Sequence, residues 1–165
     1  MSIGLDWADK IQDYCDDVTK GLQDMTKMVL FDIGLKLVER SPVGDPSTWK
    51  RQPPWLPKNY YPGTFKNNWQ LGVDVEPTDI FLAADPTGNN SINRIRLAIP
   101  RWPIGHTFTF GNNLPYAQAL EDGHSQQCPP NGMVTLTAME FPTIVEDVKL
   151  RYLSGERPST KRIPS

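Results

Sequence analysis

The residues of this chain whose types best fit catalysis or metal binding lie close together in its second half. Glu121, His124 and Cys128 are a carboxylate, an imidazole and a thiol within one short stretch. Such side chains transfer protons or bind zinc, and Ser125 beside His124 offers a hydroxyl nucleophile. The spacing matches no recognised zinc pattern, since a Cys-x-x-Cys pair is missing and His106 is the only other histidine. A small metal-dependent hydrolase centred on this cluster is one hypothesis, and a solvated polar loop after a helix is the other.

The remaining motifs favour the second hypothesis. The sequence contains no P-loop, no dinucleotide-binding fingerprint and no Gly-x-Ser-x-Gly elbow. Asp13, Asp16 and Asp17 lie along a predicted helix, where a solvated face explains them without a metal ion. We therefore expect a protein that is not an enzyme and holds no cofactor and no metal.

Composition sets the size and the class of the protein. The chain has 165 residues, is 38% hydrophobic and carries a net charge of −2, which predicts one domain over residues 1–153 and a polar tail over residues 154–165. Neither a basic footprint for strong nucleic-acid binding nor an apolar run long enough to span a membrane is present. No signal peptide is visible, which favours synthesis in the cytoplasm. Cys15 and Cys128 are too few for a disulfide scaffold.

A long helix over residues 5–40 is the strongest structural signal. Apolar residues recur there every three or four positions. They are Trp7, Ile11, Tyr14, Val18, Leu22, Met25, Val29, Ile33 and Leu37. An unbroken helix would span about 50 Å, longer than a compact domain of this size needs, so part of it would project or pack on another subunit. The alternative is two consecutive core helices broken near Gly21 or Gly34.

Beyond this helix the pattern predicts a small antiparallel sheet. The pattern predicts strands over residues 68–75, 92–100 and 104–110. Arg94 and Arg96 of the second would lie on the solvent face or toward a partner. Residues 80–82 fit either a short edge strand or an extended loop. The resulting fold class is α+β: a long N-terminal helix, a small antiparallel β-sheet with long loops, a short helix and a C-terminal helix.

The short helix and the C-terminal helix complete the pattern. Residues 114–123 form a helix with Pro115 in its first turn and Gly123 at its end. Tyr116 and Leu120 would face the core, which turns the polar residues 121–125 outward. A last helix runs from about residue 133 to residue 153, with a kink at Pro142.

The loop over residues 41–65 is rich in proline and aromatic residues. Trp49, Trp55, Tyr60 and Tyr61 lie in it. These side chains either pin the loop to its own domain or form a partner-binding surface, because exposed aromatic clusters mark interaction sites. A monomeric adaptor that binds one partner through this loop is a further hypothesis.

Two blocks of sequence resemble a known family. The first comprises SPVGDPSTWK at residues 41–50 and PGTFKNNWQ at 62–70, and the second NLPYAQALEDGHS at 113–125, continued to residue 137. Together they resemble the neck or tail-completion proteins of tailed bacteriophages, of the minor tail protein Z type. The likeness covers roughly residues 38–150. The chain departs from the family pattern at Asp122, at Cys128 and in the longer aromatic loop over residues 51–61.

The resemblance implies an α+β fold and a structural role as a head-tail connector in the virion. Members form homo-oligomers, typically hexameric rings, at the head-proximal end of the tail and join the tail to the capsid. The implied neighbours are the tail terminator, head-closure or adaptor proteins and the portal complex. The protein would be made in the host cytoplasm. Genome DNA would pass through the lumen without sequence-specific binding, and a net charge of −2 is consistent with weak phosphate contacts.

A ring of identical subunits uses two different patches on each copy. We expect the aromatic loop and the polar tip to supply these patches. The candidate interface residues are Trp49, Trp55, Tyr60, Tyr61, Glu121, His124 and Ser125. On this prediction, a charge reversal at Glu121 would impair assembly and leave the monomer folded.

Overall fold

The computed structural model of the chain describes residues 3–48, 60–125 and 128–159 and confirms the α+β fold class. The helices are α1 (Ile3–Arg40), α2 (Asn89–Ala98), α3 (Ala117–Glu121), α4 (Met133–Met139) and α5 (Phe141–Leu153). The strands are β1 (Gln70–Val73) and β2 (Phe108–Gly111), and short 3-10 turns cover Pro46–Thr48 and Lys66–Asn68.

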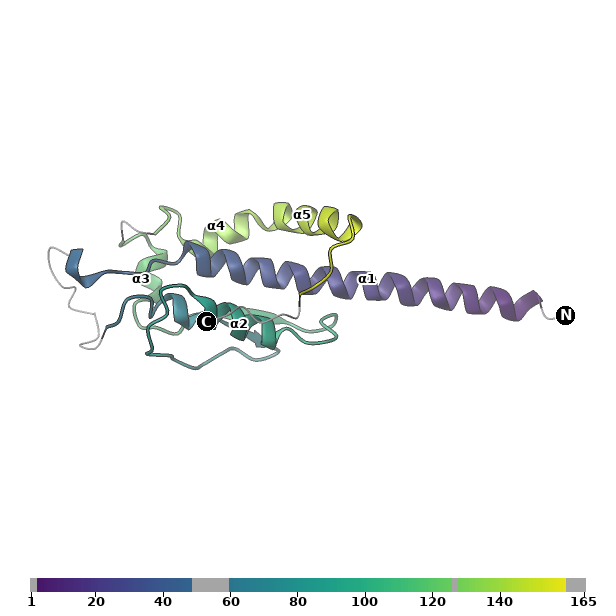
Figure 1. Cartoon of the computed structure of the whole chain (residues 1–165), viewed down its shortest axis with the longest axis horizontal. Helices are drawn as coiled ribbons and strands as arrows, with labels where there is room; N and C mark the ends of the chain where they lie inside the picture. Colours follow the sequence, from purple (N-terminus) through teal and green to yellow (C-terminus); the bar gives the residue numbers. More distant parts are fainter. Residues whose placement is uncertain (1–2, 49–59, 126–127, 160–165) are drawn as a thin grey trace.

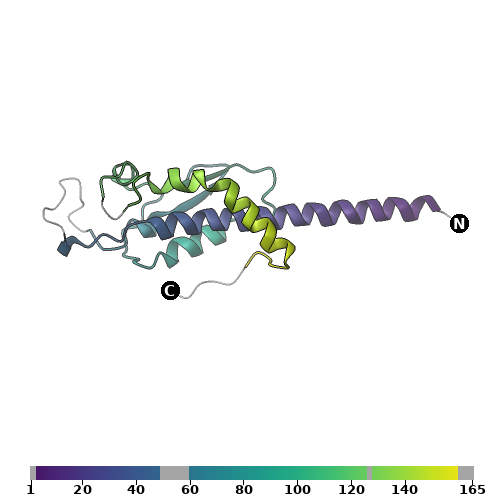
Figure 2. The ribbon, with the colours of Figure 1, turned by 90° about the horizontal axis from the view of Figure 1, so that it is seen from above.

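Helix α1 is continuous over 38 residues, so the prediction of a long helix ending at residue 40 is confirmed and neither Gly21 nor Gly34 breaks it. At about 1.5 Å per residue it is about 57 Å long. Its N-terminal part extends beyond the rest of the molecule in both views (Figure 1, Figure 2). Residues 7–20 are all exposed, and burial begins at Gly21. The helix therefore projects, as its length predicted; residues 7–22 are called the arm below.

The covered half of α1 is the centre of the body. Figure 1 shows α4 and α5 along one side of it and α2 with the strands along the other. The main core joins Val38 of α1 to Trp69, Ile95 and Tyr116, and a smaller cluster joins Met28 to α5. At Gly34, a Cβ atom would lie 2.8 Å from Ile95 Cγ2, so the absence of a side chain lets α2 approach α1 closely.

The predicted strand over residues 92–100 is wrong, because this segment forms α2. Ile92, Ile95 and Ile99 are spaced by three and four and so fit one helix face. A strand would place Leu97 on one face with Ile95 and Ile99, whereas Leu97 is 81% exposed. The helix starts after Gly88 (φ +79°), where the Asp85 carboxylate accepts hydrogen bonds from the backbone amides of Gly88 (3.0 Å) and Asn90 (2.8 Å).

The described residues therefore hold one sheet of two antiparallel strands, with Gln70 opposite Gly111 and Val73 opposite Phe108. These strands lie within the predicted strand at residues 68–75 and at the end of the one at 104–110. Residues 80–82 are an extended loop. Instead of ladder pairing, side-chain amides hold this loop: the Asn68 amide bonds both the carbonyl (2.6 Å) and the N–H (2.8 Å) of Phe81, and Gln70 Nε2 donates to Asp79 O (2.7 Å).

The predicted C-terminal helix with a kink near Pro142 is confirmed as the pair α4 and α5, which meet at Glu140. Pro142 lies in the first turn of α5, where its missing N–H breaks no helical bond. The Glu140 carboxylate pairs with Arg40 (2.7 Å) and Lys36 (3.1 Å) of α1. The bend between α4 and α5 is thus fixed against the end of α1.

We predict that Asp85→Ala destabilises the fold by about 1–2 kcal/mol, because it removes the carboxylate that accepts the first amides of α2. Glu76→Ala removes a carboxylate from an exposed position and should change the free energy of unfolding by less than about 0.5 kcal/mol. Urea denaturation of both variants measures the difference. Equal effects would mean that α2 does not depend on this cap.

Candidate interaction surfaces

The polar tip after α3 is held by an intramolecular cap. The Glu121 carboxylate accepts hydrogen bonds from the backbone amides of Met133 (2.7 Å), Val134 (3.0 Å) and Thr135 (2.9 Å), and from the Thr135 hydroxyl (3.0 Å). These amides are the unpaired donors at the start of α4, where the helix dipole also favours a negative charge. A Cβ atom at position 132 would lie 2.3 Å from Glu121 Oε1, so Gly132 makes room for the carboxylate.

The environment of Glu121 lowers its pKa. Partial burial acts to raise the pKa, but the hydrogen bonds from Val134, Thr135 and Met133 outweigh it and stabilise the ionised form. Glu121 is half-buried, and its place at a subunit interface stays a prediction. Its four donors belong to its own chain, and a charge reversal there would disturb the start of α4 in the monomer.

His124 and Cys128, the other members of the suspected chemical cluster, have different environments. His124 is exposed, and its ring Nδ1 lies 3.0 Å from the carbonyl oxygen of Ala119. Cys128 is buried, and this burial raises the pKa of its thiol, which disfavours the reactive thiolate. Within residues 3–48, 60–125 and 128–159, no group of three or more His, Cys, Asp or Glu side chains is placed to hold a metal ion. The hydrolase hypothesis thus gains no support from the geometry.

The aromatic loop is only partly within the described residues, and Trp49 and Trp55 lie outside them. The Tyr60 hydroxyl donates to the carbonyl of Val43 (2.8 Å), and its ring lies edge-on to Tyr116 with centroids 6.4 Å apart. Tyr60 therefore pins the loop to its own domain. Tyr61 is 53% exposed and stays an interface candidate, together with His124 and the half-buried Ser125.

The arm carries a stripe of exposed apolar side chains. Its apolar side chains follow one stripe at spacings of three and four, and each keeps roughly half of its surface in water. They are Trp7 (67% exposed), Ile11 (50%), Tyr14 (71%), Val18 (43%) and Leu22 (49%). Burial of a large apolar side chain contributes roughly 1.5–3 kcal/mol, so covering the exposed half of five would contribute on the order of 5 kcal/mol.

The sequence shows the spacing of the stripe, but it does not show that the stripe is exposed to solvent. Helical spacing of apolar residues normally marks a face buried in the protein's own core. For this reason the predicted interface residues include none from the arm. The usable signal was length, because a helix of about 50 Å exceeds the core that 165 residues can build. No helix of the described residues is long and apolar enough to cross a membrane.

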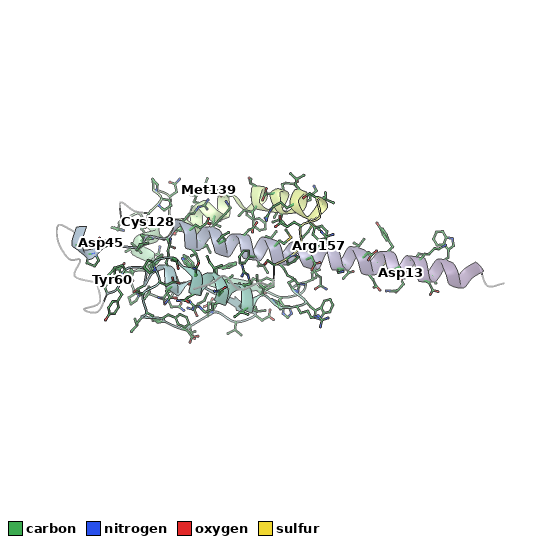
Figure 3. The ribbon with its side chains drawn as sticks, viewed as in Figure 1. Asp13, Asp45, Tyr60, Cys128, Met139 and Arg157 are labelled. Atoms are coloured by element: carbon green, nitrogen blue, oxygen red, sulfur yellow. The ribbon has the colours of Figure 1, made fainter. Side chains whose placement is uncertain are left out.

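The arm and the tip lie at opposite ends of the molecule. Figure 3 shows Asp13 on the projecting part of α1, whereas Tyr60, Asp45 and Cys128 gather at the far end of the body. The two candidate regions for contact with other molecules are thus separate. One is the apolar arm, and the other is the end that bears Tyr61, His124 and Ser125.

We predict that Glu121→Gln lowers the free energy of unfolding by about 1–2 kcal/mol at neutral pH, because the new amide group would point an N–H toward the amides of α4. A carboxyl group whose pKa is lower in the folded protein stabilises it above the unfolded pKa of about 4.3 and loses this effect as the pH falls through the folded pKa. The difference between wild type and variant should therefore shrink below about pH 4. Urea titrations at several pH values measure it.

Asp122→Asn is the matched control for this prediction. Asp122 is adjacent and exposed, and its carboxylate accepts a bond only one helical turn away, from Gln118 Nε2 (2.9 Å). It should change stability by less than about 0.5 kcal/mol. A Glu121→Gln variant as stable as Asp122→Asn would show that the cap contributes nothing.

Comparisons of the chain with protein-family models, with curated proteins and with solved structures find no match.

Proposed function

We propose that this chain is a structural protein of a tailed-bacteriophage virion, a neck or tail-completion protein. In this role it forms a homo-oligomeric ring, of six copies in the family it resembles, at the head-proximal end of the tail and joins the tail to the capsid. Its neighbours are the tail terminator, head-closure or adaptor proteins and the portal complex. Genome DNA passes through the lumen without sequence-specific binding.

The observation that carries this proposal is that the two resembling blocks pack together as one unit. Trp69 Nε1 of the first block donates to Ser41 Oγ (2.6 Å), and Ser41 Oγ lies 3.4 Å from Met133 Sδ of the second. The rings of Phe65 and Tyr116, one from each block, have centroids 6.1 Å apart. The motif residues therefore support a shared fold, because they are used for packing inside one domain.

The exposed arm supports the oligomeric part of the proposal. A monomer gains nothing from an apolar stripe that its own body leaves in water, whereas a subunit of an assembly buries it. The arm and the body are different surfaces of one copy, which is what a ring of identical subunits requires.

An amber codon at Lys10 in the phage that encodes the chain tests the proposal. Electron microscopy of non-permissive lysates should show filled heads and separate tails, because the joining protein is lost, and a suppressor strain should restore whole particles. Native mass spectrometry of the purified full chain should find a closed oligomer, alone or on addition of tails. A strictly monomeric protein, absent from virions whose infectivity does not need it, would overturn the proposal.

A further inference from the structure

A groove with an apolar floor and a basic rim lies where the arm leaves the body. It has a volume of about 590 Å³ and is bounded by the covered half of α1, the end of α2 and the segment that follows α5. Its apolar lining comes from Met28, Phe31, Leu35, Leu97, Ile99 and Pro100. A cavity of this size holds several large side chains or a small ligand.

The charges around the groove have a small positive excess. The lining includes five cationic side chains and two carboxylates, and two further carboxylates, Asp24 and Asp147, pair with Lys27 and Arg151 and leave one positive charge in excess. The cations are Lys27, Arg96, Arg101, Arg151 and Arg157, and the carboxylates are Asp32 and Glu156. Arg151 forms ion pairs with both Asp32 and Glu156 and so ties α5 to α1. Arg101 and Arg157 stack on the rings of Trp102 and Tyr152, where their charges remain at the surface.

The arm has the opposite character. Residues 7–20 include four aspartates and two lysines, so the arm is negative, and its apolar stripe is open to solvent. Asp17 lies beside the stripe, since it follows Tyr14 by one helical turn, whereas Asp13 lies farther round the helix, away from the stripe. Figure 3 places Asp13 on the projecting part of α1 and Arg157 against the body.

We infer that the arm of one copy lies in the groove of the next copy, with Trp7, Ile11 and Tyr14 toward the apolar floor and Asp17 toward Arg101 and Arg157. The inference rests on the proposed function in one respect, that copies of the chain associate. It adds the two surfaces that meet, which the proposed function leaves open.

The arm cannot fill its own groove. Arm and groove wall are parts of the same continuous helix, with the arm ending at Leu22 and the wall beginning at Lys27. A helix without a break cannot fold back on itself, so an arm that lies in this groove comes from another copy. The contact is therefore heterologous, one copy giving the arm and the other the groove, and this is the arrangement that builds rings.

The charge of the arm favours the groove over a second arm as its partner. Two arms packed side by side would bring eight aspartates and four lysines together and would repel each other, whereas the groove offers the complementary sign. An anionic membrane surface is disfavoured for the same reason. Steering by complementary charge also raises the association rate at low ionic strength.

The arm supplies part of a stable interface. Burial of Trp7 and Tyr14 removes about 150–250 Å² from water for each ring. Three aliphatic side chains of the stripe add further buried area. A standard interface buries about 800 Å² on each partner. We therefore expect the arm to be the anchor and other contacts between neighbouring bodies to supply the remainder.

The thiol of Cys15 allows a direct test on the unmodified chain. Cys15 is exposed on the arm and Cys128 is buried, so a maleimide-benzophenone reagent labels the arm selectively. After irradiation of an equal mixture of ¹⁵N-labelled and unlabelled protein, mass spectrometry should find mixed-isotope cross-links from Cys15 to residues 96–101 or 151–158. Cross-links between two arms, to the tip at residues 121–125, or only within one copy would overturn the inference.

Charge exchange gives an independent test. Asp13→Lys with Asp17→Lys should weaken self-association by about tenfold, as should Arg101→Glu with Arg157→Glu. A mixture of the two double variants should restore most of the affinity, because arms of the first meet grooves of the second with opposite charge. Glu76→Lys, an exposed charge reversal outside both surfaces, should leave the affinity within twofold. Sedimentation velocity at low and high salt measures all four.

Truncation of the stripe tests its apolar part. Trp7→Ala with Tyr14→Ala should weaken self-association by at least a hundredfold, whereas Val75→Ala, at another exposed apolar residue (72% exposed), should not change it. An oligomer that survives both the charge exchange and the truncation unchanged would overturn the arm-to-groove contact and leave the proposed function standing. A strict monomer absent from virions would overturn both.

Discussion

The constraint on which the whole structure depends is that one helix of 38 residues is longer than the body built around it. α2, α4 and α5 all pack against the covered half of α1, and the close approach at Gly34 brings Ile95 of α2 and the Phe110 ring of β2 against the same turn. The covered half fixes the helical conformation, and propagation from an existing helix needs no new nucleus. The arm can therefore stay helical in water with its apolar stripe uncovered.

Local pattern predicted the elements whose residues pack on one face. The long helix, the first strand and the division between α4 and α5 followed from spacing and from the position of Pro142. The strand prediction for residues 92–100 was wrong because Ile95 and Ile99 fit both the strand period and the helix period. With Leu97 they alternate as in a strand, and with Ile92 they lie on one helix face. What decides between them is the cap from Asp85 and the approach to α1, and the second of these is a tertiary contact that the local pattern does not contain.

Polar side chains near the ends of several elements share one physical role. This small body uses their carboxylates and amides to satisfy its own backbone. Glu121 accepts the first amides of α4, and Asn68 bonds both backbone groups of Phe81 in place of a third strand. With many loops and few ladder bonds, buried backbone groups need such partners. Polar residues of the resembling motifs are thus used for folding at these positions.

A continuous helix also carries information about assembly. Because the arm and the groove wall belong to one rod, the direction of the arm relative to its own groove is fixed by the packing of α1 against α2 and α5. If each arm lies in the next groove, the rotation between neighbouring copies is fixed by the same packing, and a heterologous contact closes into a ring only when that rotation divides a full turn. The ion pair of Asp32 with Arg151 and the contact of Gly34 with Ile95 would then help to set the copy number, although neither touches a neighbour.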